Sequence, residues 1–256
     1  MKFRFALLLS ALALLVNVAR ADARTDAVIA KARAALGTEA ALNAVKSIHF
    51  VGKFSANAKV PVNGDPKNLK DETVVLALDI VFQKPYQQRM IRRSATQIET
   101  SGLDDYDGWV RVTEAADEKK WRLQLHDARQ IRALRANTWE SLYFYRGIEK
   151  EGGRVEHAGD ATLDGKDCVK LVFIHADNIR FTRYFDKATG RLLRTDTENG
   201  NQIREDGELV VDGIRFPRTL ITRTADGQIS TITFESVKVN ERFPASEFAV
   251  PTMKAH

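Results

Sequence analysis

Tight-turn dipeptides recur between short runs of alternating apolar and polar residues, and this pattern limits the folds that the chain can adopt. Asp164-Gly165, Asp212-Gly213 and Asp226-Gly227 each separate two such runs. Aspartate followed by glycine tolerates the positive φ angles that a two-residue hairpin requires. Successive tight hairpins make neighbouring strands antiparallel, because parallel strands need a long crossover connection. The second half of the chain is therefore expected to form an antiparallel meander.

Alternation with a period of two predicts strands along most of the chain. Residues 58–71, which contain two prolines and a glycine, are expected to form the longest loop, and residues 126–146 to form helix in two short pieces. A few helices beside a large antiparallel sheet indicate an α+β fold with helices on one face. The predicted strands are 47–57, 73–83, 86–93, 95–101, 108–114, 119–125, 167–175, 179–186, 190–198, 207–211, 214–224 and 228–239.

Helical spacing of apolar residues marks the region before the first predicted strand. Thr25-Asp26 is a candidate cap for a helix that Gly37 ends, because glycine readily takes the left-handed conformation that follows a helix. Thr38 is a candidate cap for a second short helix.

The first twenty-one residues have the composition of a cleavable signal peptide. Lys2 and Arg4 precede an apolar run from residue 5 to 18, and Ala19-Arg20-Ala21 fits a signal-peptidase site. Cleavage two residues later fits nearly as well, and an uncleaved N-terminal anchor is the alternative. We expect residues 1–21 to be removed and residues 22–256 to form a single domain, since 235 residues suffice for one core.

Charge and cysteine content exclude several classes of protein. Removal of Lys2, Arg4 and Arg20 lowers the net charge of +5 by three, to +2, which gives little attraction to nucleic acid. The basic cluster Arg89, Arg92 and Arg93 is expected to be a solvated strand face. A single cysteine, Cys168, forms no internal disulfide, so a packed core must provide stability in an oxidising compartment.

The segment Asp186-Lys187-Ala188-Thr189-Gly190 has two interpretations. It is similar to the phosphorylated aspartate motif of P-type ATPases, which would make Asp186 a covalent nucleophile. It also fits a hairpin turn, in which Asp186 and Thr189 bond the backbone and Gly190 takes a positive φ. Alternating residues on both sides and the absence of a phosphate-binding loop favour the turn.

No other segment predicts an active site, a metal site or a cofactor. Residues 103–108 match part of an EF-hand loop, but Leu103 occupies the position of the first ligand, so a solvated turn is favoured. Cys168 lies in an apolar strand, where a thiol is usually inert, although a Cys–His pair assembled in space is an alternative. The five histidines have no metal-ligand spacing. We expect a protein that is not an enzyme.

Apolar side chains that share strand faces are the remaining candidates for a binding site. They are expected either to form core beneath the helices or to line an apolar cleft in a wide sheet that short helices cover only in part. The candidate cleft residues are Trp121, Leu123, Leu125, Leu171, Phe173, Phe181 and Phe234.

Several segments together resemble the bacterial LolA-like superfamily of outer-membrane lipoprotein-sorting proteins. These are the hairpin YFDKATGRLL at 184–193, the strand pair VVDGIRFP at 210–217 and the closing tail with Asn240, Phe248 and Pro251. The opening, ALGTEAALNAVKSI at 35–48, is similar to the start of the same proteins.

The resemblance implies a curved antiparallel half-barrel whose helices cover an apolar concave face. It also implies a periplasmic, monomeric carrier that binds lipoprotein acyl chains or another lipid without a cofactor. The alternative within the same superfamily is a non-catalytic sensor or interaction module that binds an envelope protein.

Overall fold

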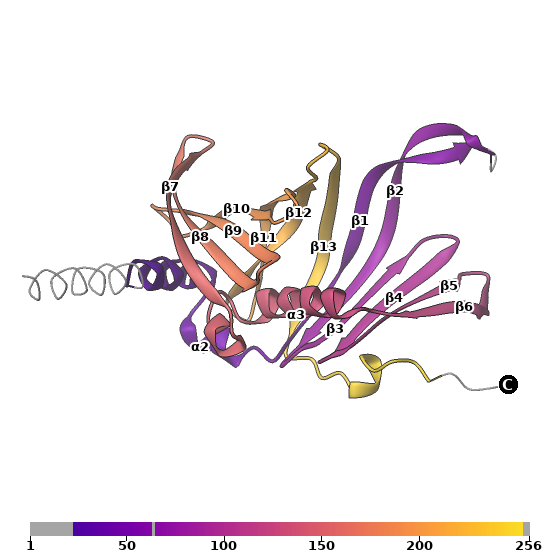
Figure 1. Cartoon of the computed structure of the whole chain (residues 1–256), viewed down its shortest axis with the longest axis horizontal. Coiled ribbons are helices and arrows are strands. Elements are labelled where there is room, and N and C mark those ends of the chain that lie inside the picture. Colours follow the sequence, from indigo (N-terminus) through magenta and orange to yellow (C-terminus); the bar gives the residue numbers. More distant parts are fainter. Residues whose placement is uncertain (1–22, 63–64, 253–256) are drawn as a thin grey trace, which may run out of the picture. The chain divides into compact units, whose positions relative to one another are not determined.

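Antiparallel strands dominate the computed structural model, which describes residues 23–62 and 65–252. Thirteen strands belong to one open sheet, accompanied by a few helices (Figure 1). The α+β class with one large antiparallel sheet is confirmed. The predicted signal peptide, residues 1–21, lies outside the described residues. No helix within the described ranges is long and apolar enough to cross a membrane.

The described residues divide into two compact units. Unit 1 contains residues 23–36 and 145–198, and unit 2 contains residues 37–144 and 199–252. That residues 22–256 form a single domain stays a prediction.

Nine strands of unit 2 follow the order β6-β5-β4-β3-β2-β1-β13-β12-β11. Consecutive strands are neighbours within β1 to β6 and within β11 to β13, as tight hairpins require. Their bounds are β1 Ser47–Val62, β2 Asp65–Gln83, β3 Gln87–Arg93, β4 Gln97–Asp104, β5 Asp107–Glu114, β6 Asp117–Leu125, β11 Gln202–Val211, β12 Ile214–Arg223 and β13 Ile229–Val239.

The predicted loop at residues 58–71 is wrong. Residues 58–62 and 65–71 form the outer part of the β1–β2 hairpin, in which Asn57 pairs with Thr73 and Val60 with Lys70. The pairing of β1 with β13 ends at Ala56, so the hairpin continues past it as a two-stranded ribbon. Prolines suggested a loop, but proline is compatible with a ribbon whose edges face solvent.

One face of the unit 2 sheet, here called the helix face, packs against α3 (Ala128–Leu142). Helix α3 lies across β2 to β5 (Figure 1), and Thr138 Oγ1 and Asn137 Nδ2 donate to Gln88 Oε1 at 3.2 and 3.3 Å. Asp127 and Gln130 form a capping box at its start. The prediction of two short helices in 126–146 is wrong, because residues 128–142 are continuous and the chain then turns through Phe144 at φ 47°.

Residues 240–252, here called the tail, run over the opposite face, here called the tail face. Ser47 Oγ donates to the Glu241 carbonyl, and Gln83 exchanges hydrogen bonds with the backbone of Phe243. A short 3₁₀ turn, η2 (Ala245–Glu247), then places Phe248 in a fully buried position. The short helix α2 (Glu39–Ala44) begins as predicted, since Thr38 Oγ1 accepts from the Ala41 N–H.

Unit 1 combines four strands in the order β10-β9-β8-β7 with a helix at residues 23–36. The helix ends before Gly37 as predicted, but Thr25 lies inside it and is not its cap. The strand β7 (Arg154–Leu163) was not predicted. The other strands are β8 (Lys166–Ala176), β9 (Ile179–Asp186) and β10 (Leu192–Thr197), and a 3₁₀ turn, η1 (Ile148–Glu151), precedes β7. Tyr145 packs its ring against Phe173 and Phe185, which are almost fully buried.

Candidate functional site

Residues 186–190 form the hairpin turn between β9 and β10, so the turn interpretation is confirmed. Asp186 Oδ1 accepts hydrogen bonds from the N–H groups of Ala188 and Thr189 at 2.7 and 2.9 Å. The Thr189 N–H is the main reason why the pKa of Asp186 lies below its usual range. Gly190 has φ 75° and donates its N–H to the Asp186 carbonyl. The carboxylate is therefore engaged in holding the turn.

The acidic segment at residues 103–108 is likewise a turn. Asp104 pairs with Asp107 across the β4–β5 hairpin, Asp105 has φ 53°, and Leu103 is fully buried. Within residues 23–62 and 65–252, no three His, Cys, Asp or Glu side chains gather in a metal-binding arrangement. Cys168 is buried in β8, and burial raises the pKa of its thiol.

The seven predicted cleft residues fall in both units. Leu171, Phe173 and Phe181 share one face of β8 and β9 in unit 1, where Leu171 and Phe173 are fully buried. The Arg183 guanidinium lies 4.6 Å from the centre of the Phe173 ring, so this face carries a buried cation among aromatic rings.

Phe234 belongs to the helix face of unit 2. Its ring centre lies 4.6 Å from that of Phe50, which also contacts Phe82 and Phe216. All four phenylalanines are at least nine-tenths buried. They form an aromatic layer on the face that α3 covers.

Trp121, Leu123 and Leu125 share one face of β6, as predicted, but this is the tail face. They pair with Thr113, Arg111 and Trp109 of β5. Trp121 and Leu125 are exposed at 40% and 62%. That the seven residues bind a ligand stays a prediction.

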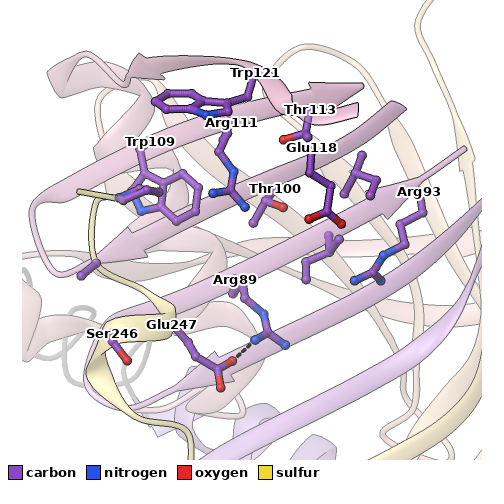
Figure 2. Close-up of a pocket in the computed structure, with 14 residues that line it drawn as sticks. Arg89, Arg93, Thr100, Trp109, Arg111, Thr113, Glu118, Trp121, Ser246 and Glu247 are labelled. Atoms are coloured by element: carbon purple, nitrogen blue, oxygen red, sulfur yellow. Dashed lines mark ion pairs between the residues drawn. The ribbon is translucent and has the colours of Figure 1, made fainter. Parts of the chain in front are cut away.

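A pocket of about 510 Å³ opens on the tail face of unit 2 and combines tryptophan with arginine side chains (Figure 2). Alternation along β3, β4 and β5 brings every second residue of each strand into this pocket. Its lining residues are Arg89, Ile91, Arg93, Ile98, Thr100, Trp109, Arg111, Thr113, Glu118, Trp121, Ser246, Glu247, Ala249 and Pro251.

Gly102 allows Trp109 to form one wall of the pocket. The two residues pair across β4 and β5, and a Cβ at Gly102 would lie 2.4 Å from the indole ring. The indole therefore lies flat over the glycine, where Nε1 donates to the Phe248 carbonyl at 2.8 Å. This bond fixes the tail at the edge of the pocket.

Arg89 holds the tail through the two terminal nitrogens of its guanidinium group. Its guanidinium donates to Asp79 Oδ1 at 2.8 Å and forms an ion pair with Glu247 (Figure 2). Partial burial acts to raise the pKa of Asp79, but hydrogen bonds from Arg89 and His49 outweigh it and leave the pKa below its usual range. His49 also bonds Glu241 of the tail, Nδ1 to Oε2 at 2.7 Å.

Arg93 and Arg111 differ from Arg89, because neither has an ion-pair partner among the described residues. Figure 2 shows both side chains, and that of Glu118, directed into the pocket from different strands. The Nε of Arg111 is buried and lacks a hydrogen bond to any described residue. The pocket thus holds cationic donors whose bonding capacity is unused.

The sequence predicted that Arg89, Arg92 and Arg93 form one solvated strand face, and this prediction was only partly right. Arg92 lies on the helix face, where it pairs with Glu99, whereas Arg89 and Arg93 lie on the tail face. A period of two places Arg89 and Arg93 on one face of β3 and Trp109 and Arg111 on one face of β5, but only the strand register shows that the two faces coincide. That the tail lies over the same face was not indicated by any local pattern.

No protein-family model matches the chain, and no curated protein has a significantly similar sequence. Solved structures do match over most of its length. A DUF1329 family protein from Desulfovibrio piger is 11% identical with a TM-score of 0.54, and a putative outer membrane lipoprotein-sorting protein domain from Vibrio parahaemolyticus is 13% identical with the same TM-score. Each likeness covers 88% of this chain and 97% of the other.

A LolA superfamily protein from Nitrosomonas europaea matches 84% of this chain and 98% of its own, with 11% identity and a TM-score of 0.52. The chain has a LolA-like fold. This agrees with the α+β half-barrel class that the sequence predicted. At such low identity the likeness concerns the LolA-like fold alone, so no functional residue is transferred from these proteins.

Proposed function

We propose that the chain is a periplasmic carrier that binds lipoprotein acyl chains or another lipid and takes part in outer-membrane lipoprotein sorting. The observation that supports this best is the LolA-like fold, shared over 88% of the chain with a putative lipoprotein-sorting domain. In this proposal the protein is exported, monomeric and not an enzyme, and it binds no nucleic acid.

The aromatic layer of Phe50, Phe82, Phe216 and Phe234 is the proposed surface for the acyl chain in unit 2. Helix α3 packs on this face over β2 to β5, next to the strands that carry the layer, so in this proposal the acyl chain enters when α3 moves away from the sheet. Each CH₂ group that leaves water contributes about 0.8 kcal/mol, which makes a long acyl chain a sufficient ligand without charged contacts. Binding of this kind needs no chemical reaction, only a movement of α3.

Quenching by brominated lipid tests the proposal, because the three tryptophans report on different faces. Trp139 of α3 is buried beside the helix face, whereas Trp109 and Trp121 line the tail-face pocket. In a variant with Trp109→Phe and Trp121→Phe, acyl chains brominated near the middle should quench Trp139. Native purification should also recover bound lipid by mass spectrometry. No quenching, no co-purified lipid and no binding of an apolar fluorescent probe would refute the proposal.

A second candidate, a non-catalytic envelope sensor or interaction module, is favoured by the β1–β2 ribbon. Beyond Ala56 the ribbon has no neighbouring strand among the described pairings and presents exposed Leu69. A free strand edge of this kind offers backbone donors and acceptors to a partner. Replacement of residues 58–71 with a short turn should then abolish capture of a stoichiometric envelope protein while lipid binding is unchanged.

A further inference from the structure

The tail-face pocket has the composition of a binding site, because it combines polar donors with an aromatic surface. Arg93, Arg111, Thr100 and Thr113 supply the donors, and the ring of Trp121, which pairs with Thr113, supplies an apolar surface beside Arg111 (Figure 2). Trp121 is 40% exposed although its ring lines the pocket. Large exposed aromatic rings beside polar groups are typical of ligand sites.

The arrangement of donors follows from strand register. Arg111 pairs with Thr100 across β5 and β4, and Thr113 pairs with Ile98, which in turn pairs with Arg93 of β3. The four donor side chains therefore lie on one face of three neighbouring strands, where Ile98 separates Arg93 from Thr113 and the two arginines reach the pocket from β3 and β5. Neither threonine hydroxyl has a hydrogen-bond partner among the described residues, and both threonines are more than nine-tenths buried.

Unused donors in a partly enclosed pocket favour an anion. A buried donor without a partner costs about 1–3 kcal/mol, which a ligand oxygen at Arg111 Nε would remove. Guanidinium groups bind tetrahedral oxyanions well, because their fork of N–H groups matches two oxygens at once. Two arginines and two hydroxyls offer more donors than a carboxylate with two oxygens requires, so a phosphoryl group is the better match.

Arg89 does not take part in this site, and Glu118 opposes it. Arg89 is already neutralised by Asp79 and Glu247. Glu118 lines the pocket without a salt bridge to any described residue, so its charge weakens binding of an anion. Removal of the Glu118 charge should therefore strengthen anion binding, which gives a substitution that improves affinity.

We propose that the tail-face pocket binds a phosphate monoester or diester, with the phosphoryl oxygens on Arg93 and Arg111 and the organic part of the ligand against Trp121. The site is distinct from the aromatic layer on the helix face. It therefore does not depend on the proposed carrier function. The phosphoryl group has two possible sources, a free phosphate ion and the headgroup of a phospholipid.

Titration calorimetry with three probes separates these sources. The probes are inorganic phosphate, dihexanoyl phosphatidylglycerol below its critical micelle concentration, and dihexanoylglycerol, which has the same chains without phosphate. We expect the phospholipid to bind at least tenfold more tightly than phosphate, and dihexanoylglycerol not to bind at this pocket. Equal affinity for phosphate and the phospholipid would identify free phosphate as the source and would overturn the proposed contact of an organic part with Trp121. No binding of either phosphate compound, or equal binding of dihexanoylglycerol, would overturn the proposal.

Four variants test the assigned roles in the full exported chain. Arg111→Gln should weaken both phosphate compounds at least tenfold, whereas Trp121→Ala should weaken only the phospholipid. Glu118→Gln should strengthen both severalfold. Arg92→Gln is the matched control, because Arg92 lies on the same strand as Arg93 but on the opposite face, paired with Glu99.

A thermal melt of each variant excludes loss of the fold as the cause. If Arg111→Gln did not fold, Arg93→Gln and Glu118→Gln would still give opposite changes in affinity. Unchanged affinity in folded Arg111→Gln and Arg93→Gln, or an equal loss in Arg92→Gln, would overturn the assignment. Binding that is insensitive to ionic strength would also contradict it, because salt screens an exposed pair of charges.

Discussion

Asp186 lies in a segment that is similar to a catalytic motif, but its role in this chain is structural. Its carboxylate accepts hydrogen bonds from two backbone N–H groups within the β9–β10 turn, and no metal-binding group of His, Cys, Asp or Glu side chains is found in the described chain. The local hydrogen bonds are sufficient to account for this residue.

Asp186→Asn should therefore be mild, with a loss of about 1 kcal/mol or less in the free energy of unfolding at pH 7, because the amide oxygen still accepts both bonds. The pKa of Asp186 is lowered in the folded chain, so its contribution is present above the ordinary aspartate range and is lost as the pH falls through the lowered pKa. Urea unfolding at pH 7 and pH 3 should show the difference between the two proteins shrinking in acid. A folded variant that loses all ligand binding would contradict the structural role.

Gly190 should tolerate substitution less well than a glycine with the same backbone conformation elsewhere. Both Gly190 and Gly165 have φ near 75°, but a Cβ at Gly190 would lie 2.7 Å from the Lys31 carbonyl oxygen, and one at Gly165 meets nothing within 4 Å. Gly165→Ala should cost about 1 kcal/mol, and Gly190→Ala about 1–3 kcal/mol more. Chemical denaturation of the two variants measures the difference, and equal losses would show that the helix at residues 23–36 yields to the added methyl group.

At the scale of elements, one of the contacts that hold the tail to the sheet depends on the absence of a side chain at Gly102. The Trp109 indole reaches the Phe248 carbonyl only because Gly102 leaves room beneath it. The remaining contacts, from His49, Gln83 and Arg89, hold residues 241–247. The end of the tail that borders the pocket thus depends most on Trp109.

Gly102→Ala should loosen the end of the tail, since the new methyl group would displace the indole and break its bond to Phe248. Hydrogen exchange should show faster exchange at the Phe248 amide, which η2 otherwise protects. Gly108→Ala is the control on the helix face, where a Cβ would approach Ile131 and His126 of unit 2 at 3.1–3.2 Å. Unchanged exchange in Gly102→Ala, or the same change in Gly108→Ala, would contradict this role.

Local patterns predicted most strands and missed those in which proline, glycine or charged residues obscure the alternation. Hairpin dipeptides and alternation located twelve of the thirteen strands, because turn chemistry and pleat are properties of neighbouring residues. Residues 58–71 were misassigned because their pairing partner lies across the same hairpin, where proline and charge obscure the alternation. Strand β7 was missed for a similar reason, since glycine and mixed polarity at residues 154–163 weaken the signal.

The candidate site was less predictable than the fold. Trp121 was selected from the sequence, but Arg93, Arg111 and Trp109 were not, because their convergence requires the register of β3, β4 and β5. The wall made by residues 246–251 comes from the opposite end of the chain. Long-range pairing of this kind produces no recognisable pattern within any ten consecutive residues of the sequence.

At the scale of the whole molecule, the question is whether the two units unfold together. The chain provides a separate reporter for each, because all three tryptophans lie in unit 2 and the single cysteine, Cys168, is fully buried in unit 1. Burial also raises the pKa of the thiol, so labelling at neutral pH depends on unfolding.

We expect tryptophan fluorescence and Cys168 labelling to change at the same urea concentration, because the thirteen strands belong to one sheet and a single domain unfolds cooperatively. Pulse labelling with a thiol reagent along a urea gradient, followed by mass spectrometry, gives the second curve. Leu171→Ala, which removes a fully buried side chain of unit 1, should shift both curves equally and cost about 2–5 kcal/mol. If this variant moved only the labelling curve, units 1 and 2 would be separate folding domains, and the single-domain prediction would be wrong.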